Sequence, residues 1–403
     1  MTTVADTRPG LLDRRLSRPA AFAAIAAILL TFAAASAAPS PMYVVYQRLW
    51  GFSESTLTVI FAVYVVGLIG SLLVLGALSD HVGRRPVLAA AILLEAVSLV
   101  LFLAAGNVGV LLAARVLQGI ATGAAFTTLG AALVDLNPPH SPGRAGLING
   151  IAPVSGLAVG ALGTGALVQF APAPTHFVWA VLLAAMLLAG LLVARIPETS
   201  ARRPGAAASL APRLGIPARL RADVFALLPI IVASWAIGGL YLSLGPSVAA
   251  GVFGLENRLI GGFVVTLLCG TGAVTSYVLR AAPTRRVLTI AGALLTAGAV
   301  IGVLGVEFAS VALAAAGTVV SGIGFGASAL ASFGTLAQIA APAERGELFA
   351  VALVIAYLAF SVPAVIAGVS ATSAGLHATA LVYGSAVAVL GALALLAQRR
   401  RLG

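Results

Sequence analysis

The residues of this chain that could do chemistry are few, and several of them crowd into one short stretch. Charged residues make up only 9% of the 403 residues. Yet the segment GALSDHVGRRPVL, residues 76 to 88, holds an aspartate, a histidine and two adjacent arginines between two apolar runs. Two further ionisable residues, Glu95 and Arg115, fall inside apolar runs themselves. Ionisable residues in such places indicate a functional role.

Several classes of chemistry are excluded by residues that the chain lacks. All of its 23 basic residues are arginines, so a lysine-dependent phosphate-binding loop and a Schiff-base lysine are both impossible. The sequence has no H-E-x-x-H motif, its single cysteine is Cys269, and its four histidines fall in predicted loops. We therefore expect no metal site and no cofactor, and we expect that the protein is not an enzyme.

The composition predicts a membrane protein. Hydrophobic residues make up 61% of the chain and the mean hydropathy is +1.10, whereas soluble domains are about 45–50% apolar. Apolar runs long enough to cross a bilayer as helices recur throughout. We predict twelve spans, at residues 19–39, 54–75, 87–105, 108–134, 146–170, 177–195, 223–249, 258–279, 287–305, 311–337, 347–371 and 377–397.

The placement of the arginines predicts the orientation. On the twelve-span map, only Arg48 and Arg258 fall on one side and Arg115 lies within a span, while all the others fall on the opposite side. This asymmetry is typical of cytoplasmic loops. It predicts a multi-pass protein of the cell membrane with both termini in the cytoplasm. The net charge of +11 is thereby explained without a nucleic-acid partner.

The two halves of the chain carry a repeated pattern. Arg84 and Arg285 each precede an apolar run and lie 201 residues apart, and the loop residues Arg144 and Arg345 have the same separation. Parallel repeats of this kind are a transporter architecture, with the substrate site between the halves. The longest polar interval divides them, which predicts a six-helix bundle at 1–196, a cytoplasmic linker at 197–222 and a second six-helix bundle at 223–403.

Three motifs resemble those of the major facilitator superfamily. GALSDHVGRRP resembles its signature loop between the second and third spans, RVLQGIATG resembles its Arg-x-x-Gln-Gly motif in the fourth span, and PET, at residues 197 to 199, follows the sixth. The resemblance implies an all-α membrane protein of twelve helices in two six-helix bundles, related by pseudo-two-fold symmetry. It further implies a monomeric secondary transporter that moves a small molecule by alternating access.

The resemblance assigns a gating role to the loop. The loop residues are Gly76, Asp80, Gly83, Arg84 and Arg85. Glycines permit a tight turn and close backbone approach, and the arginines hold the loop at the lipid headgroups. Asp80 would meet the start of the eleventh span, near Gly346 and Glu347, and so latch the halves together when the cavity faces out. The alternative is that the loop fixes only topology and turn geometry.

Arg115, Gln118 and Glu95 are predicted to act in substrate or proton coupling. Arg115 is costly in hydrocarbon and must face the bundle interior or water. Gln118 lies one turn away on the same helix face, and Glu95 is the one acid at membrane depth that could pair with Arg115. The alternative is a buried ion pair that only orients two helices.

The seventh span could line the transport cavity. In SWAIGGLYLSLGPS the candidates are Ser234, Trp235, Tyr241 and Ser243, because helices interrupted by glycine and proline mark such sites. Aromatic residues also belong to interfacial belts, which is the alternative for Tyr241.

The sequence thus predicts secondary active transport coupled to a proton or another ion gradient. Efflux of small amphipathic compounds is the first expectation. SGLAVGALGTG in the fifth span partly resembles the antiporter motif of exporters, but Ala161 and Thr164 stand where its proline and second glycine would be. Uptake of a sugar or an organic anion by a permease is the alternative, followed by a non-transporting receptor of the same fold.

Overall fold

The computed structural model describes residues 15–141, 143–212, 214–341 and 344–399. The described residues are almost entirely helical and contain no strand, so the predicted all-α fold is confirmed. Five arginines of the charge pattern lie outside the described residues: Arg8, Arg14, Arg213, Arg400 and Arg401.

The helices fall into two sets of six membrane-crossing segments. The first set contains α1 (Arg18–Ala37), α2 (Pro39–Trp50), α3 (Glu54–Leu75), α4 (Leu78–Val82), α5 (Arg84–Leu103), α6 (Val108–Asp135), α7 (Arg144–Phe170) and α8 (Pro174–Arg195). The second contains α9 (Arg221–Ser243), α10 (Gly245–Gly251), α11 (Arg258–Val278), α12 (Thr284–Glu307), α13 (Val311–Ile339), α14 (Arg345–Ala374) and α15 (Leu376–Arg399). Short 3-10 turns η1 (Ala208–Leu210), η2 (Ala218–Leu220) and η3 (Leu279–Ala281) lie between them.

The twelve predicted spans are confirmed. Twelve helical segments of the described chain are long and apolar enough to cross a membrane. One predicted boundary was wrong, because the first span, predicted to end at residue 39, continues through α2 to Trp50. Prolines in the first turn of α2 cost no hydrogen bond, and the helix buries Met42, Tyr43 and Tyr46.

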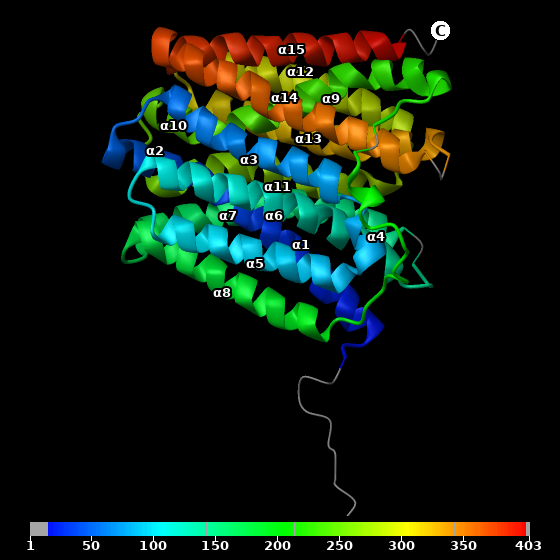
Figure 1. The fold of residues 1–403 in the computed structure, drawn as a ribbon. Coiled ribbons are helices and arrows are strands. Elements are labelled where there is room, and N and C mark those ends of the chain that lie inside the picture. The colour runs from blue at the N-terminus through cyan, green and yellow to red at the C-terminus, as the bar shows by residue number, and fades with distance from the viewer. Residues whose placement is uncertain (1–14, 142, 213, 342–343, 400–403) are drawn as a thin grey trace, which may run out of the picture.

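Each half folds as a bundle, and the linker joins the bundles along one end (Figure 1). In the first half α6 packs on α3 and α5, and α7 on α1. In the second half α13 packs on α11 and α12, and α14 on α9. The two bundles meet where α3 crosses α14 and where α7 crosses α11. We call the end that carries residues 197–222 the linker end and the other the opposite end.

The sequence repeat recurs in the structure. Helix α7 begins at Arg144 and α14 at Arg345, which preserves the separation found in the sequence. Helix α5 begins at Arg84 and its counterpart α12 at Thr284. The structure is therefore built from two copies of one helical pattern.

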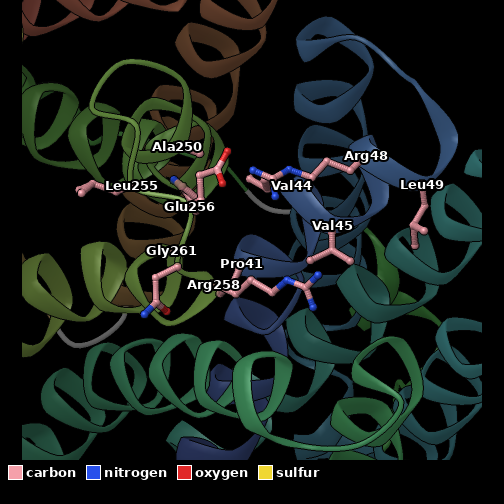
Figure 2. A pocket seen from close by; sticks show the side chains of 12 residues that line it. Pro41, Val44, Val45, Arg48, Leu49, Ala250, Leu255, Glu256, Arg258 and Gly261 are labelled. Atoms are coloured by element: carbon pink, nitrogen blue, oxygen red, sulfur yellow. The ribbon is translucent and has the colours of Figure 1, made fainter.

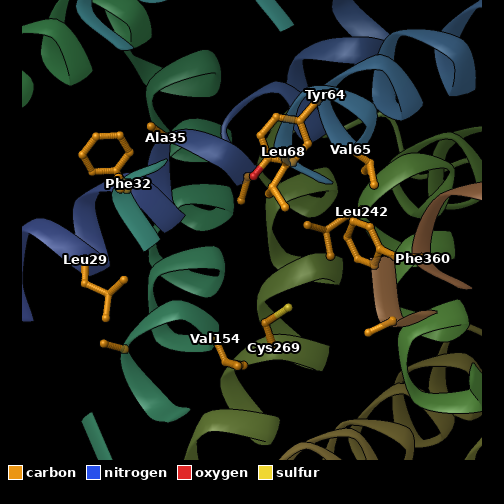
Figure 3. Close-up of a cluster of buried hydrophobic side chains, with 14 of the residues drawn as sticks. Leu29, Phe32, Ala35, Tyr64, Val65, Leu68, Val154, Leu242, Cys269 and Phe360 are labelled. Atoms are coloured by element: carbon orange, nitrogen blue, oxygen red, sulfur yellow. The ribbon is translucent and has the colours of Figure 1, made fainter. Parts of the chain in front are cut away.

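Glycine pairs bring helices into close contact. A Cβ on Gly119 would lie 2.1 Å from the Tyr64 carbonyl oxygen on α3, and one on Gly326 would lie 2.0 Å from the Gly272 carbonyl oxygen on α11. In lipid, such small residues let helix backbones approach and pack. The core continues across both bundles, with Leu68 on one side and Phe360 on the other (Figure 3).

Candidate functional site

The predicted gating loop contains a short helix followed by a glycine with a positive φ. Residues 78–82 form α4, and Gly83 has φ +110°, which L side chains rarely adopt. Gly76 has an ordinary φ of −56°, but a Cβ there would lie 2.4 Å from the Leu72 carbonyl oxygen. Both glycines are thus needed, one for its backbone conformation and one for close approach.

The side chain of Arg84 contacts three polar side chains around the loop. Its Nη1 lies 2.5 Å from Asp80 Oδ1 and donates to Ser79 Oγ at 2.6 Å, while its Nε donates to Asp135 Oδ2 at 3.1 Å. The arginine therefore ties α4 to the end of α6 within the first half. Arg85 instead donates to backbone carbonyls at the end of α8.

Glu198, the acid of the PET motif, to which the sequence analysis assigned no role, anchors the linker to the loop. Its carboxylate accepts hydrogen bonds from the backbone N–H groups of Arg84 at 2.8 Å and Arg85 at 3.1 Å, at the start of α5. It also accepts from the N–H groups of Thr199 and Ser200. Partial burial raises the pKa of Glu198, but these four donors outweigh burial and hold the pKa below its usual range.

Asp80 faces its own half in this structure. Its carboxylate pairs with Arg84, and its backbone oxygen accepts from Arg203 N–H at 3.2 Å and Ser200 Oγ at 3.0 Å. Among the described residues it makes no hydrogen bond or ion pair with the start of α14. That start lies against the linker, where a Cβ on Gly215 would lie 2.8 Å from Glu347 Oε2. The latch stays a prediction for another conformation.

The structure brings Arg115, Gln118 and Glu95 together inside the first bundle. Gln118 lies between them: its Oε1 accepts from Arg115 Nη1 at 2.6 Å, and its Nε2 donates to Glu95 Oε1 at 3.0 Å. Arg115 is 1% exposed and the other two are fully buried. A neutral amide thus bridges the acid and the base, which do not form a direct ion pair.

The two ends of this network differ, because Arg115 is better satisfied than Glu95. Besides its 2.6 Å hydrogen bond to Gln118, Arg115 donates long hydrogen bonds to the carbonyl oxygens of Ser36 and Ile60, at 3.4 and 3.5 Å, and its guanidinium stacks 4.1 Å from the centre of the Tyr64 ring. Glu95 Oε2 is buried and has no hydrogen-bond partner among the described residues. A carboxylate buried with one oxygen unpaired is costly when it is charged.

An aromatic cluster lies where the bundles meet. Phe61 of α3 packs on Phe360 of α14 with ring centres 5.0 Å apart, and Trp235 of α9 contacts Tyr357 and Phe360 in edge-to-face geometry. We call these four residues the interface aromatic cluster. Sequence analysis found Trp235 and missed the other three, because α14 carries no motif and isolated aromatics in apolar runs give no signal.

The candidates of the seventh span do not form one site. Trp235 joins the interface aromatic cluster, whereas Tyr241 hydrogen-bonds Thr318 Oγ1 at 2.7 Å inside the second bundle. Ser243 Oγ donates to the Gly239 carbonyl of its own helix at 2.7 Å. Ser234 Oγ is buried without a partner. The helix does break here, as α9 ends at Ser243 and α10 begins at Gly245.

The halves are joined tightly at the opposite end. The backbone N–H of Ser55 on α3 donates to Thr372 Oγ1 on α14 at 3.1 Å, and Thr266 Oγ1 on α11 donates to the Ala158 carbonyl on α7 at 2.8 Å. A Cβ on Gly262 would lie 2.2 Å from the Ala161 carbonyl oxygen. The segment with the partial antiporter motif therefore forms part of this closed contact.

A small pocket lies between the halves at the same end (Figure 2). It has a volume of about 100 Å³, and its wall includes Arg48 of α2 together with Glu256 and Arg258 at the start of α11. The two arginines that the sequence analysis set apart from all others thus line one pocket.

This arrangement is that of a multi-pass membrane transporter, in which two repeated bundles close over a central interface. The family model of the Major Facilitator Superfamily matches residues 20–302, and the chain belongs to this family. Members of the family are transporters.

Three individual proteins are similar to this chain in sequence or in fold. The chain is 31% identical over 113 residues to the transporter paaT of Penicillium rubens, a match that covers 28% of this chain and 21% of that protein. The human organic anion transporter MFSD10 superposes with a TM-score of 0.67 at 18% identity, covering 94% of this chain and all of that one. A bacterial homolog of the human lysosomal transporter Spinster, in an inward-facing, occupied conformation, reaches 0.75 at 14% identity, covering 95% and 97%. The two solved structures support the fold alone.

Proposed function

We propose that this protein is a proton-coupled exporter of small, planar, amphipathic molecules in the cell membrane, with both termini in the cytoplasm. The main support for the proposal is the way in which the two bundles contact each other. The contacts at the opposite end are made by a few hydrogen bonds and glycines between α3 and α14 and between α7 and α11. Bundles joined in this way can rock about a central site, as alternating access requires.

The interface aromatic cluster is the proposed substrate site. Trp235 and Tyr357 are partly exposed, while Phe61 and Phe360 behind them are buried. Aromatic faces bind planar rings by stacking and bind cations through the ring quadrupole. The cluster is drawn from both bundles, so a substrate bound there would contact both moving parts.

Glu95 is the proposed proton carrier. Binding a proton removes the cost of a buried carboxylate that has one oxygen without a partner. The change would reach Arg115 through Gln118, and Arg115 stacks on Tyr64, a neighbour of Phe61 on α3. Protonation inside the first bundle would thereby alter the helix face that contributes to the substrate site.

Proteoliposomes with an imposed pH gradient test the proposal. We expect ethidium, a planar aromatic cation, to accumulate in vesicles that are acidic inside, because protons leaving would drive the dye inward. Glu95→Gln should remove the dependence on the gradient while the dye still exchanges down its own gradient. The same vesicles loaded with glucose or p-aminobenzoate test uptake of a sugar or an organic anion. Gradient-driven movement of either, with none of ethidium, would replace the exporter proposal.

A further inference from the structure

A second cavity lies wholly within the second bundle. Its volume is about 390 Å³, within the range usual for ligand pockets, about 300–1,000 Å³. Its walls come from α9, α11, α12, α13 and α15, with α10 and the loop after it. All of its lining residues lie between Ile237 and Val387, so the first bundle does not contribute. None of the four residues of the interface aromatic cluster lines this cavity, so the two sites are separate.

Small residues leave this space open. Glycines fix the distance between α12 and α13: a Cβ on Gly298 would lie 2.4 Å from Ser321 N, and one on Gly317 would lie 2.5 Å from Gly302 N. Gly302 itself lines the cavity, and a Cβ there would meet nothing within 4 Å. The helices thus approach closely beside the cavity while the cavity stays unfilled.

One wall of the cavity carries hydroxyl groups among apolar neighbours. Thr318 Oγ1 donates to the Ala314 carbonyl at 2.8 Å, so its contact with the Tyr241 hydroxyl, at 2.7 Å, uses the tyrosine proton. The Tyr241 oxygen can then still accept a hydrogen bond. Ser321 also lines the cavity, and its hydroxyl makes no hydrogen bond with any described residue. No charged side chain lines the space.

Two lining residues of the cavity lie at the surface of the second bundle. Phe263 and Val311 line it and are 49% and 46% exposed. Both lie in helices that are long and apolar enough to span the membrane. A ligand would therefore enter past these two residues.

We propose that this cavity binds a neutral, mainly apolar molecule that carries one hydroxyl or carbonyl group. The apolar walls take up the body of the ligand, and Ser321 and Tyr241 supply one donor and one acceptor that orient it. A charged headgroup would find no partner and is excluded. The site is additional to the transport pathway.

Photolabelling of the purified protein in detergent tests this site. The probe is 1-octanol bearing a diazirine, compared with the corresponding octane derivative, and labelled peptides are mapped by mass spectrometry. We expect saturable labelling of α9, α11 and α13 by the alcohol and competition by unlabelled 1-octanol. Gly302→Leu should fill the cavity and remove this labelling. Gly163→Leu is the matched control, because a Cβ on Gly163 also meets nothing within 4 Å but lies on α7, outside the cavity.

Two outcomes would overturn the proposal. One is unchanged saturable labelling in a folded Gly302→Leu protein, and the other is equal loss in Gly163→Leu. If the Gly302→Leu protein does not fold, labelling of the Ser321→Ala protein tests the site instead. Loss of one hydrogen bond should reduce the preference of labelling for the alcohol probe over the alkane probe about two- to tenfold. If the original protein shows no such preference, the proposed site is refuted.

Competition with the photolabelling probe identifies the natural source of the ligand. A neutral lipid, dioleoylglycerol, added to the same preparation should displace the probe if bilayer lipid supplies the ligand. Displacement by 1-octanol alone supports a smaller free lipophile. Displacement by neither compound contradicts the proposed binding chemistry.

Discussion

At the scale of single residues, the charge inside the first bundle is compensated through an intermediary. Gln118 offers its carbonyl to Arg115 and its amide to Glu95, and an amide can do both because it carries an acceptor and a donor. A direct ion pair would hold the two charges in one geometry. The amide bridge leaves Glu95 Oε2 without a partner, so the acid keeps a site for a proton while its position is fixed.

Arg115 should be indispensable for transport. Arg115→Ala removes the buried cation and the hydrogen bond to Gln118 Oε1, and it leaves Glu95 without a compensating charge nearby. We expect transport to be lost while some protein still inserts. Arg115→Lys should recover only part of the activity, because lysine keeps the charge but not the planar group that stacks on Tyr64. Rates of ethidium transport per inserted protein measure this, and normal transport by Arg115→Ala would refute the role.

Glu198 should make stability depend on pH. Its pKa is held below the usual range in the folded protein, so the stabilisation is present above the unfolded pKa of about 4.3 and is lost as the pH falls through the folded value. The thermal unfolding midpoint of the original protein should exceed that of Glu198→Gln at neutral pH, and the difference should shrink on acidification. Glu256→Gln, at an exposed residue without a hydrogen-bond partner, is the control. A constant difference at all pH values would contradict the prediction.

At the scale of helices, the crossing of α7 and α11 controls how tightly the opposite end closes. Gly262→Ala places a Cβ 2.2 Å from the Ala161 carbonyl oxygen and 3.2 Å from Gly165 Cα, both backbone atoms. The helices must therefore separate, and the closed state should lose population. Gly163→Ala, also in this helix pair, adds a Cβ that meets nothing.

Spin labels at the opposite end measure this separation. Phe170 at the end of α7 is 76% exposed and Glu256 before α11 is also exposed, so cysteines there can carry the labels. We expect longer distances to gain population in Gly262→Ala and not in Gly163→Ala. Identical distance distributions in all three proteins would show that this crossing does not limit closure.

The sequence predicts the helices far better than the contacts between them. Apolar runs define all twelve spans because lipid forces each segment to satisfy its own backbone. The extension by α2 was missed because Pro39 and Pro41 suggest a break, although both lie where a helix tolerates proline. The interface aromatic cluster could not be found because Phe61 and Phe360 are 299 residues apart, and their contact depends on how the bundles dock.

At the scale of the whole molecule, the arginine distribution predicts which side the linker faces. The linker end carries Arg84, Arg144 and Arg286, whereas Arg48 and Arg258 line the pocket at the other end. Ala201 in the linker and Ser373 near the end of α14 are both exposed, so each can be replaced by a cysteine that a reagent could reach. After removal of the buried Cys269, an impermeant thiol reagent applied to intact cells should label the Ser373→Cys protein and spare the Ala201→Cys protein. Equal labelling would refute the orientation.

The gating loop should bias the equilibrium between the two conformations of the whole molecule. In this structure Asp80 pairs with Arg84 and is 47% exposed, so that pair contributes little. With the linker ends together, Asp80 is predicted to meet the start of α14, where a helix N-terminus favours a carboxylate by about 0.3–1 kcal/mol. Asp80→Asn should therefore lower the population with closed linker ends about two- to fivefold.

Labels on the linker ends of the two bundles can detect this change. Gly146 on α7 and Arg286 on α12 are exposed and lie in different bundles, so their distance reports closure of this end. Asp135→Asn is the matched control, because it also removes a carboxylate partner of Arg84 but leaves Asp80 in place. A shift in Asp80→Asn alone supports the latch. A similar shift in both variants would mean that Arg84, and not the predicted contact with α14, sets the balance, and the loop would then serve only to fix the turn.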